Sequence, residues 1–154
     1  MLTNNEIELN ITTLSVFFEP RNEFIQWVKE FSDGKLIVDC GCGCANTTAT
    51  LRMAGVKAIG LDLICPERAL IGDIHVIDAT DYPFSSDTIG MMCRPNRGDW
   101  IHATITKAVE SGAKFIYVGK ESHYKTDLQP LSYKVQKVMT NAGISNECVW
   151  VIER

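Results

Sequence analysis

This sequence lacks any apolar run long enough to span a membrane. The N-terminal stretch MLTNNEIELN is polar and acidic, without a basic region or an apolar region, so we expect no secretory signal. The 15 basic residues are outnumbered by 19 acidic ones, so the net charge of −4 provides no overall basic field for a phosphate backbone. We therefore expect a cytoplasmic protein, and neither a membrane nor a nucleic acid is an expected partner.

Cysteine occurs six times, but never in the CxxC spacing that most zinc sites use. Three cysteines alternate with glycine and three are scattered singly: Cys40, Cys42 and Cys44, and then Cys65, Cys93 and Cys148. Without an export signal, these thiols are expected to stay reduced. We predict no metal site and interpret the cysteines as small apolar packing residues.

The length of 154 residues, 45% of them hydrophobic, fits one globular domain and leaves little room for a separate substrate domain. We predict a single domain over residues 1–154, with 1–33 as an N-terminal helical cover and 34–154 as an α/β core. Within the cover, residues 12–31 carry apolar side chains at helical spacing with Pro20 between them. This pattern predicts two helical pieces that cover one face of a sheet.

Strand and helix patterns alternate along the rest of the chain. The pattern predicts strands at residues 36–40, 57–62, 74–78, 88–93, 114–118 and 148–152, and helices at 46–54, 99–110 and 130–141. Strands joined mainly by helices indicate an α/β fold with a doubly wound, mostly parallel sheet and right-handed crossovers.

The strongest functional signal lies between residues 36 and 63. An apolar strand is followed by the turn DCGCG at 39–43, a helix-compatible run, and a second strand that ends at Asp62. Glycines at such a turn let backbone N–H groups approach a ligand that a Cβ would hold off, and an acid at the next strand tip can accept both ribose hydroxyls. The order predicts a nucleotide-cofactor half-site.

These segments resemble class I S-adenosylmethionine-dependent methyltransferases. The stretch VDCGCG at 38–43 is similar to that family's first motif of hydrophobic, acid, any residue, Gly, any residue, Gly. Asp62 matches the acid that ends the family's second strand, and IDATDYPF at 77–84 is similar to its acid-centred segment before strand four. The matches run in family order and imply a Rossmann-like methyltransferase fold with S-adenosylmethionine as cofactor.

The resemblance implies cofactor-binding roles for seven residues: Asp39, Gly41, Gly43, Asp62, Leu63, Asp78 and Ala79. Asp39 would lie near the methionine amino group, and the two glycines would let the backbone approach the methionine and ribose. Asp62 would hold the ribose hydroxyls, and Asp78 the adenine amine. The alternatives are an ordinary βα turn for the glycines, turn capping for Asp62 and Asp78, and a core role for Leu63.

Two other nucleotide-binding classes fit less well. The dinucleotide fingerprint requires a third glycine or alanine where this chain has Asn46, and the chain leaves no room for the second half of a dehydrogenase. A P-loop is excluded because no GK[ST] follows the glycines.

The acceptor would sit at the carboxyl ends of the strands, near the loops at 93–100 and 119–124. The catalytic candidates are Asp99 and His123 as bases and Arg94 as an anion-binding group. His102 and Glu121 are further candidate bases, and Arg97 is a second anion-binding candidate. Each has a plainer alternative: Asp99 could cap a helix, His102 could face solvent, and His123 could be an exposed loop residue.

The loop after the fourth strand reads Pro95-Asn96, the reverse of the order found in amino-directed DNA methyltransferases. Two further departures from the family are a shortened crossover at 64–73 and the expected absence of the full C-terminal strand hairpin.

From the motifs and the resemblance we predict an S-adenosylmethionine-binding protein, a methyltransferase for an unidentified acceptor. The alternatives are a non-catalytic module for cofactor or partner, or an enzyme that cleaves the cofactor. A terminal edge strand would favour a homo-oligomer or a partner subunit.

Overall fold

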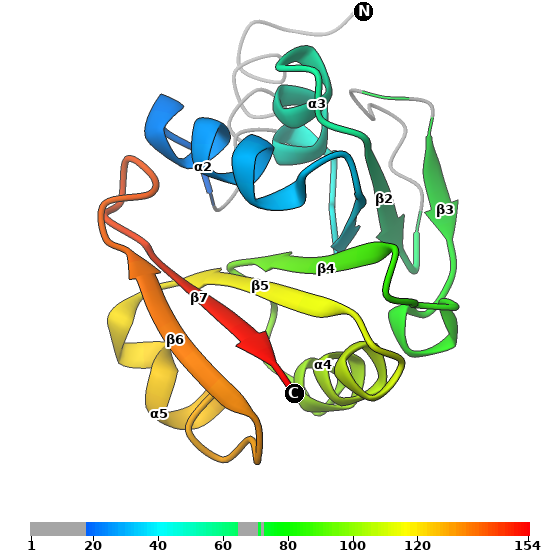
Figure 1. Ribbon diagram of the computed structural model, residues 1–154, viewed down its shortest axis with the longest axis vertical. Coiled ribbons are helices and arrows are strands. Elements are labelled where there is room, and N and C mark those ends of the chain that lie inside the picture. Colours follow the sequence, from blue (N-terminus) through cyan, green and yellow to red (C-terminus); the bar gives the residue numbers. More distant parts are fainter. Residues whose placement is uncertain (1–17, 65–70, 72) are drawn as a thin grey trace, which may run out of the picture.

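The computed structural model describes residues 18–64, 71 and 73–154 (Figure 1). A seven-stranded sheet with the order β3-β2-β1-β4-β5-β7-β6 runs through the molecule. Its strands are β1 (Leu36–Cys40), β2 (Ala58–Asp62), β3 (Ile74–Val76), β4 (Thr88–Cys93), β5 (Lys114–Gly119), β6 (Lys134–Met139) and β7 (Cys148–Glu153). The first five strands are parallel, and β7 is antiparallel to both β5 and β6. The predicted doubly wound α/β fold is confirmed.

Helices cover both faces of this sheet (Figure 1). They are α2 (Asn22–Ser32), α3 (Asn46–Met53), α4 (Trp100–Glu110) and α5 (Tyr124–Asp127), with short 3₁₀ turns η1 (Ala79–Asp81) and η2 (Glu121–His123). Successive strand residues point to opposite faces, so Ile37 packs in the apolar cluster under α2 and α3, and Val38 packs in the cluster under α4. The strands therefore read as nearly continuous apolar runs.

The predicted helix at 130–141 is wrong, because β6 occupies the centre of that segment. Leu131, Val135 and Val138 are spaced as on a helix face, but Val135 pairs with Ile152 of β7 in an antiparallel ladder. Pairing with β7 makes this segment a strand, and such pairing between distant segments cannot be seen in the local sequence pattern. The predicted absence of the C-terminal hairpin is therefore also wrong: β6 and β7 form it.

This hairpin also changes the edge of the sheet. The terminal strand β7 lies between β5 and β6, so it is not an edge strand, and the edge on this side is β6. Lys134 and Lys137 project from β6, and a register irregularity falls between Lys137 and Met139. Lysines and bulges are the features that blunt an exposed edge. The edge-pairing argument for self-association therefore loses its basis.

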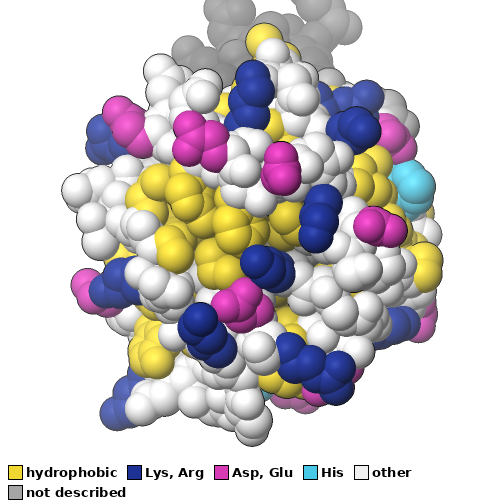
Figure 2. All heavy atoms as spheres, in the orientation of Figure 1, with side chains coloured by type: hydrophobic (Ala, Val, Ile, Leu, Met, Phe, Trp, Pro, Cys, Tyr) yellow, Lys and Arg dark blue, Asp and Glu magenta, His cyan; other side chains and the backbone are white. Residues whose placement is uncertain are grey.

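On the N-terminal side, α2 confirms the second of the two predicted helical pieces. Most of the first piece, predicted between residue 12 and Pro20, lies outside the described residues, as does most of the predicted short crossover at 64–73. Hydrophobic side chains gather over the sheet beside α2 on the face seen in Figure 2. On α2 itself, Trp27 and Phe31 stack at 4.8 Å between ring centroids and stay half-buried. Among the described residues, no helix combines the length and apolar character needed to cross a bilayer.

Candidate cofactor site

A cavity of about 330 Å³ opens at the carboxyl ends of β1, β2 and β4. This edge is where chain connections diverge from β1 toward β2 on one side and β4 on the other, the usual ligand position in an open α/β sheet. All seven residues that the sequence assigned to the cofactor line this cavity: Asp39, Gly41, Gly43, Asp62, Leu63, Asp78 and Ala79. The structure therefore brings the predicted residues together, although their binding role stays a prediction.

The two glycines of the turn after β1 have different surroundings. Gly41 (φ +70°) and Gly43 (φ +57°) both adopt left-handed backbone that disfavours other residues. A Cβ at Gly41 would lie 2.9 Å from Cη2 of Trp100, so the indole packs directly on this turn. A Cβ at Gly43 would meet no atom within 4 Å, so that side of the turn is open. The open side gives a ligand access to the backbone.

Asp39 is a buried carboxyl in the cavity wall, only 3% exposed. Its Oδ2 accepts a hydrogen bond of 2.7 Å from the Thr48 hydroxyl. The pKa of Asp39 is raised to about 7, chiefly by burial, with the charge of Asp62 adding to the rise and the Thr48 hydrogen bond opposing it. A buried carboxylate is stabilised by a cation, so this position favours a ligand ammonium.

Asp62 ties the end of β2 to the glycine turn. Its Oδ2 accepts from the Gly43 N–H and its Oδ1 from the Leu63 N–H, both at 2.8 Å. The capping alternative for Asp62 is thus present, but each carboxylate oxygen keeps a lone pair for a hydroxyl. Leu63 is 67% exposed at the rim of the cavity, so the core alternative for this residue is wrong.

Asp78 lies beyond β3 and caps η1. Its Oδ1 accepts from the backbone N–H of Thr80 at 3.0 Å and from the Thr80 hydroxyl at 2.7 Å. These hydrogen bonds hold the pKa of Asp78 below its ordinary value. The capping role predicted as the alternative is therefore real, and the exposed carboxylate lines the cavity at the same time. Ala79, the next residue, is buried in the wall.

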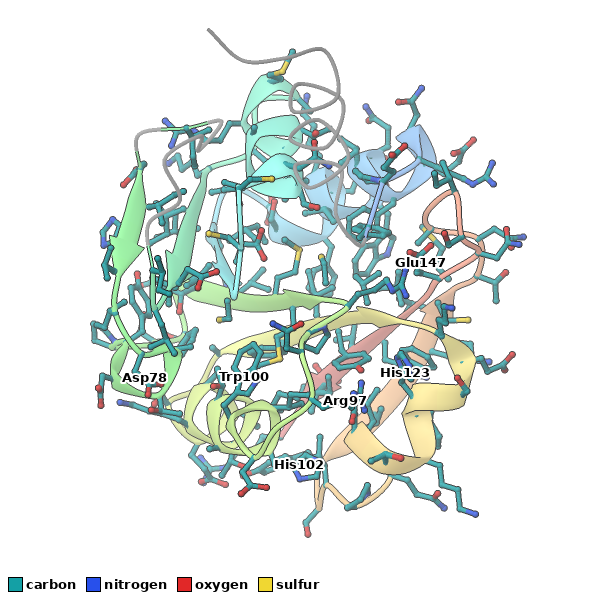
Figure 3. The ribbon with its side chains drawn as sticks, turned by 180° about the vertical axis from the view of Figure 1, so that it is seen from behind. Asp78, Arg97, Trp100, His102, His123 and Glu147 are labelled. Atoms are coloured by element: carbon teal, nitrogen blue, oxygen red, sulfur yellow. The ribbon has the colours of Figure 1, made fainter. Side chains whose placement is uncertain are left out.

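The three catalytic candidates do not come together. Arg94 lines the cavity, whereas Asp99 and His123 are not among its lining residues. Asp99 is exposed at the N-cap position of α4 and makes no capping hydrogen bond with its side chain. In Figure 3, Asp78 and Trp100 lie on one side of Arg97, and His123 lies on the other.

His123 is half-buried in η2, and its Nδ1 has no hydrogen-bond partner among the described residues. Burial, followed by the positive charge of Arg97, lowers the pKa of His123, which favours the neutral imidazole. A neutral imidazole can accept a proton. His102 is committed elsewhere, since its Nε2 lies 2.9 Å from the Asp127 carbonyl oxygen, so the solvent-facing alternative does not describe it.

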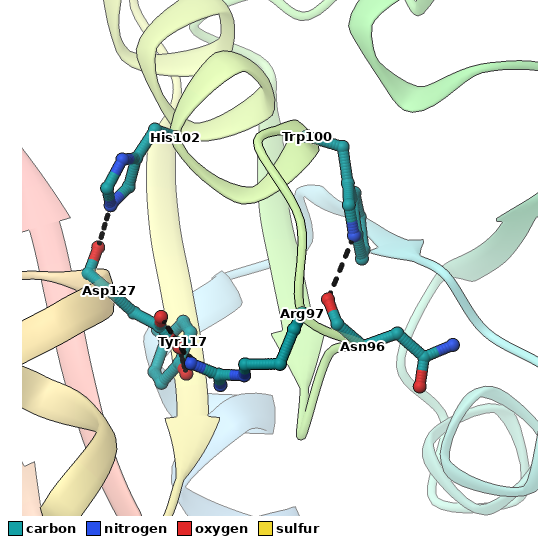
Figure 4. Close-up of polar contacts among 6 residues, drawn as sticks. All are labelled: Asn96, Arg97, Trp100, His102, Tyr117 and Asp127. Carbon is teal, nitrogen blue, oxygen red and sulfur yellow. Dashed lines mark hydrogen bonds and ion pairs between the residues drawn. The ribbon is translucent and has the colours of Figure 1, made fainter.

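Sequence reasoning missed a polar network beside the site (Figure 4). Asp127 is 3% exposed and accepts two hydrogen bonds of 2.7 Å from the Arg97 guanidinium and another from the Tyr117 hydroxyl. The same loop carries Asn96, whose carbonyl accepts from the Trp100 indole at 3.0 Å. The network therefore fixes the loop that places Trp100 over the glycine turn.

Of the five described cysteines, Cys40, Cys44 and Cys148 are buried, and Cys42 and Cys93 are partly buried. Burial, followed by the charge of Asp39, raises the pKa values of Cys40 and Cys42 above the ordinary range of a thiol. In the described part of the chain, no group of three or more His, Cys, Asp or Glu side chains is arranged to hold a metal ion.

No protein-family model and no curated protein matches this sequence. Solved structures do match it. A SAM-dependent methyltransferase from Archaeoglobus fulgidus superposes with a TM-score of 0.59 at 10% identity, over 86% of this chain and 91% of that one. The Burkholderia thailandensis 1,6-didemethyltoxoflavin-N1-methyltransferase, solved with bound 1,6-didemethyltoxoflavin and S-adenosylhomocysteine, gives a TM-score of 0.58 at 11% identity, over 86% of this chain and 77% of that one.

The magnesium protoporphyrin IX methyltransferase from Synechocystis, solved with bound SAM, gives a TM-score of 0.53 at 15% identity, over 100% of this chain and 86% of that one. At such low identities these likenesses show the fold. The chain has the fold of class I S-adenosylmethionine-dependent methyltransferases.

Proposed function

We propose that this protein binds S-adenosylmethionine in the cavity at the ends of β1, β2 and β4 and transfers its methyl group to an acceptor still to be identified. The observation that carries the proposal is the gathering of Asp39, the glycine turn, Asp62 and Asp78 around one cavity in this sheet order. Two of the structural neighbours described above were solved with S-adenosylmethionine or S-adenosylhomocysteine bound.

The donor groups in the cavity fit the parts of this cofactor. Asp39 supplies a buried negative charge for the ammonium, and the open side of Gly43 leaves room beside the backbone. Asp62 offers lone pairs to the ribose hydroxyls. Asp78 stands on the β3 side as acceptor for the adenine amine.

When bound, S-adenosylmethionine supplies a methyl group on a sulfonium, which needs in-line positioning of a nucleophile and a base only when that nucleophile carries a proton. Pro95 and Asn96, in the loop after β4, form the wall on the acceptor side. Trp100 lines the cavity and packs on the glycine turn at Gly41. His123 and Asp99 stay candidate bases for an acceptor large enough to extend beyond the cavity.

Calorimetric titration with S-adenosylhomocysteine tests the cofactor site. We expect micromolar binding that Asp62→Ala abolishes. The matched control is Asp87→Ala, which removes an exposed acid of the turn before β4 and should bind as wild type does. If wild type binds neither S-adenosylhomocysteine nor S-adenosylmethionine, the proposal is wrong.

One observation favours a second candidate, a non-catalytic module that binds the cofactor. None of the four candidate bases for the acceptor, Asp99, His102, Glu121 and His123, is among the described residues that line the cavity. Incubation with S-adenosylmethionine alone separates these functions: consumption without an acceptor would instead support a cofactor-cleaving enzyme. Tight binding with no turnover across a broad acceptor panel would favour the module. Self-association stays a prediction, and a strict monomer by light scattering would count against it.

A further inference from the structure

One wall of the cavity is formed by the chain that leaves β4 and enters α4. Five residues of this segment line the cavity: Cys93, Arg94, Pro95, Asn96 and Trp100. The first is the last residue of β4 and the last is the first residue of α4, so the chain between them belongs to no helix or strand. Because a loop lacks the repeating hydrogen bonds of a regular element, the shape of this wall depends on the contacts that hold the loop.

The strongest of these contacts is made by two residues that are not among the cavity's lining residues, Arg97 and Asp127. Arg97 lies in the middle of the loop, and its guanidinium donates from Nη1 and Nη2 to the two carboxylate oxygens of Asp127, each at 2.7 Å. Two parallel charge-assisted hydrogen bonds fix the orientation of a guanidinium as well as its position. The loop is therefore held in place from outside the cavity.

Asp127 is itself fixed by the neighbouring elements (Figure 4). The hydroxyl of Tyr117, a fully buried residue of β5, donates to the same carboxylate. The ring Nε2 of His102, on α4, lies 2.9 Å from the Asp127 backbone carbonyl oxygen. Asp127 is 3% exposed at the end of α5, so the anchor of the loop is part of the packed interior.

The loop also positions the indole that packs on the glycine turn. The Trp100 indole N–H donates to the Asn96 carbonyl at 3.0 Å, and a Cβ at Gly98 would lie 3.1 Å from Cδ1 of the same ring. On its other edge, Cη2 of this ring lies 2.9 Å from the place of a Cβ at Gly41. A shift of the loop would therefore move both the wall and the side chain that supports the turn.

We propose that Asp127, acting through Arg97, is a positioning residue for the cofactor cavity, and that cofactor affinity depends on this ion pair although neither residue contacts the ligand. Without the pair, the ligand must order the loop and the indole as it binds, which lowers its affinity. This inference rests on the proposed function, because the affinity concerned is that for S-adenosylhomocysteine.

Calorimetric titration with S-adenosylhomocysteine tests the inference in Arg97→Ala, in Asp127→Asn and in the double variant. Each single change should weaken binding by at least about threefold, and the double variant should bind no more weakly than the weaker single variant, because both changes remove the same support. The double variant also removes the buried carboxylate, so it stays measurable if Arg97→Ala alone does not fold. A smaller loss in the single variants, or losses that multiply in the double variant, overturns the inference.

Ile152→Val is the matched control for a general loss of stability. It removes one methyl group from a fully buried side chain of β7 that does not line the cavity. The core should be weakened, but the affinity for S-adenosylhomocysteine should stay within about twofold of wild type. An affinity loss equal to that of Arg97→Ala would show that any destabilisation weakens binding, which overturns the inference.

The indole of Trp100 gives a direct readout of position. In protein labelled with 5-fluorotryptophan, fluorine NMR should give one signal for each of the three tryptophans, and Trp100→Phe identifies the signal of Trp100. Without ligand, Arg97→Ala should shift or broaden that signal and leave the signal of Trp27, on α2, unchanged. Ile152→Val should not move the Trp100 signal. A Trp100 signal that Arg97→Ala leaves unchanged overturns the inference.

The two proposals fail in different ways. Wild type that binds neither S-adenosylhomocysteine nor S-adenosylmethionine overturns the proposed function and the inference together. Wild type that binds, with variants that bind equally well, overturns the inference alone and leaves the cofactor site as proposed.

Discussion

Arg97 and Asp127 form a two-pronged ion pair across 30 residues of sequence, with both N–O distances at 2.7 Å. The pair joins the loop after β4 to the end of α5, and the Tyr117 hydroxyl donates to the same carboxylate from β5. Asp127 is buried, whereas the Arg97 side chain is 51% exposed. The loop after β4, β5 and α5 are therefore held together by one carboxylate.

Arg97→Ala should destabilise the protein, because it leaves Asp127 buried with only part of its hydrogen bonds. Half-exposure of Arg97 reduces the effect, so we expect a loss of about 1–3 kcal/mol in the free energy of unfolding, measured by urea denaturation. Arg154→Ala breaks an exposed ion pair and should cost about 0–1 kcal/mol. Equal losses of unfolding free energy in the two variants would show that the burial of Asp127 does not make its ion pair more stabilising than an exposed one.

Arg94 and Glu147 allow a sharper test of a buried charge. Arg94→Gln alone should cost about 2–4 kcal/mol, since Glu147 is fully buried and loses the cation at 3.9 Å. Glu147→Gln in the same chain should recover much of that loss, because an uncharged amide is cheaper to bury than a carboxylate. Urea unfolding of the two single variants and the double variant measures the coupling. Strict additivity of the three changes would contradict it.

The raised pKa of Asp39 predicts that the contribution of this group to folding stability falls as pH rises. Its pKa is about 7 in the folded protein and 3.8 in the reference state, so the folded state binds the proton more tightly. Between those two values the unfolded state holds fewer protons, so this group makes the protein less stable as pH rises from about 4 to 7. The loss from this one group amounts to ~4 kcal/mol at most.

Asp39→Asn removes this titration. The variant should therefore gain stability relative to wild type as pH rises, with the gain complete above pH 7 and absent near pH 4. The same change removes the charge that attracts the ligand ammonium, so S-adenosylhomocysteine should bind much more weakly. Urea unfolding at a series of pH values checks the first expectation and calorimetry the second. A stability difference that does not change with pH would show that Asp39 has an ordinary pKa.

The sequence predicted the βα units well because their signals are local. Leu36–Cys40 and Thr88–Cys93 are apolar runs buried on both faces, and the structure gives both strands with the predicted bounds. The segment Lys134–Met139 has no such run; its strand state depends on pairing with β7, which local pattern does not contain.

The site residues also fall into those that the sequence predicted and those that it missed. Asp62 was predicted from its place at the tip of a strand that follows a glycine turn, and Asp39 from the resemblance of that turn to a known family motif; both lie at the same edge of the sheet because their strands are adjacent and parallel. Glu147 and Asp127 were missed because each is a single acid in or next to a loop, and its burial is decided by distant segments that fold over it. No local signal distinguishes such an acid from an exposed one.

Gly43 separates ligand binding from folding. Gly43→Ala places a Cβ where no protein atom lies within 4 Å, so the only structural cost is the left-handed backbone at φ +57°, about 1–2 kcal/mol. The same Cβ points into the space that the cofactor needs, so S-adenosylhomocysteine binding should fall by more than tenfold, about 1.4 kcal/mol or more.

Gly34→Ala is the control, because Gly34 has a similar positive φ of +80° and equally open surroundings but lies before β1, outside the cavity lining. Both variants should lose similar stability by urea unfolding, and only Gly43→Ala should lose affinity by calorimetry. Unchanged affinity in Gly43→Ala would mean that the ligand does not approach the backbone at this turn.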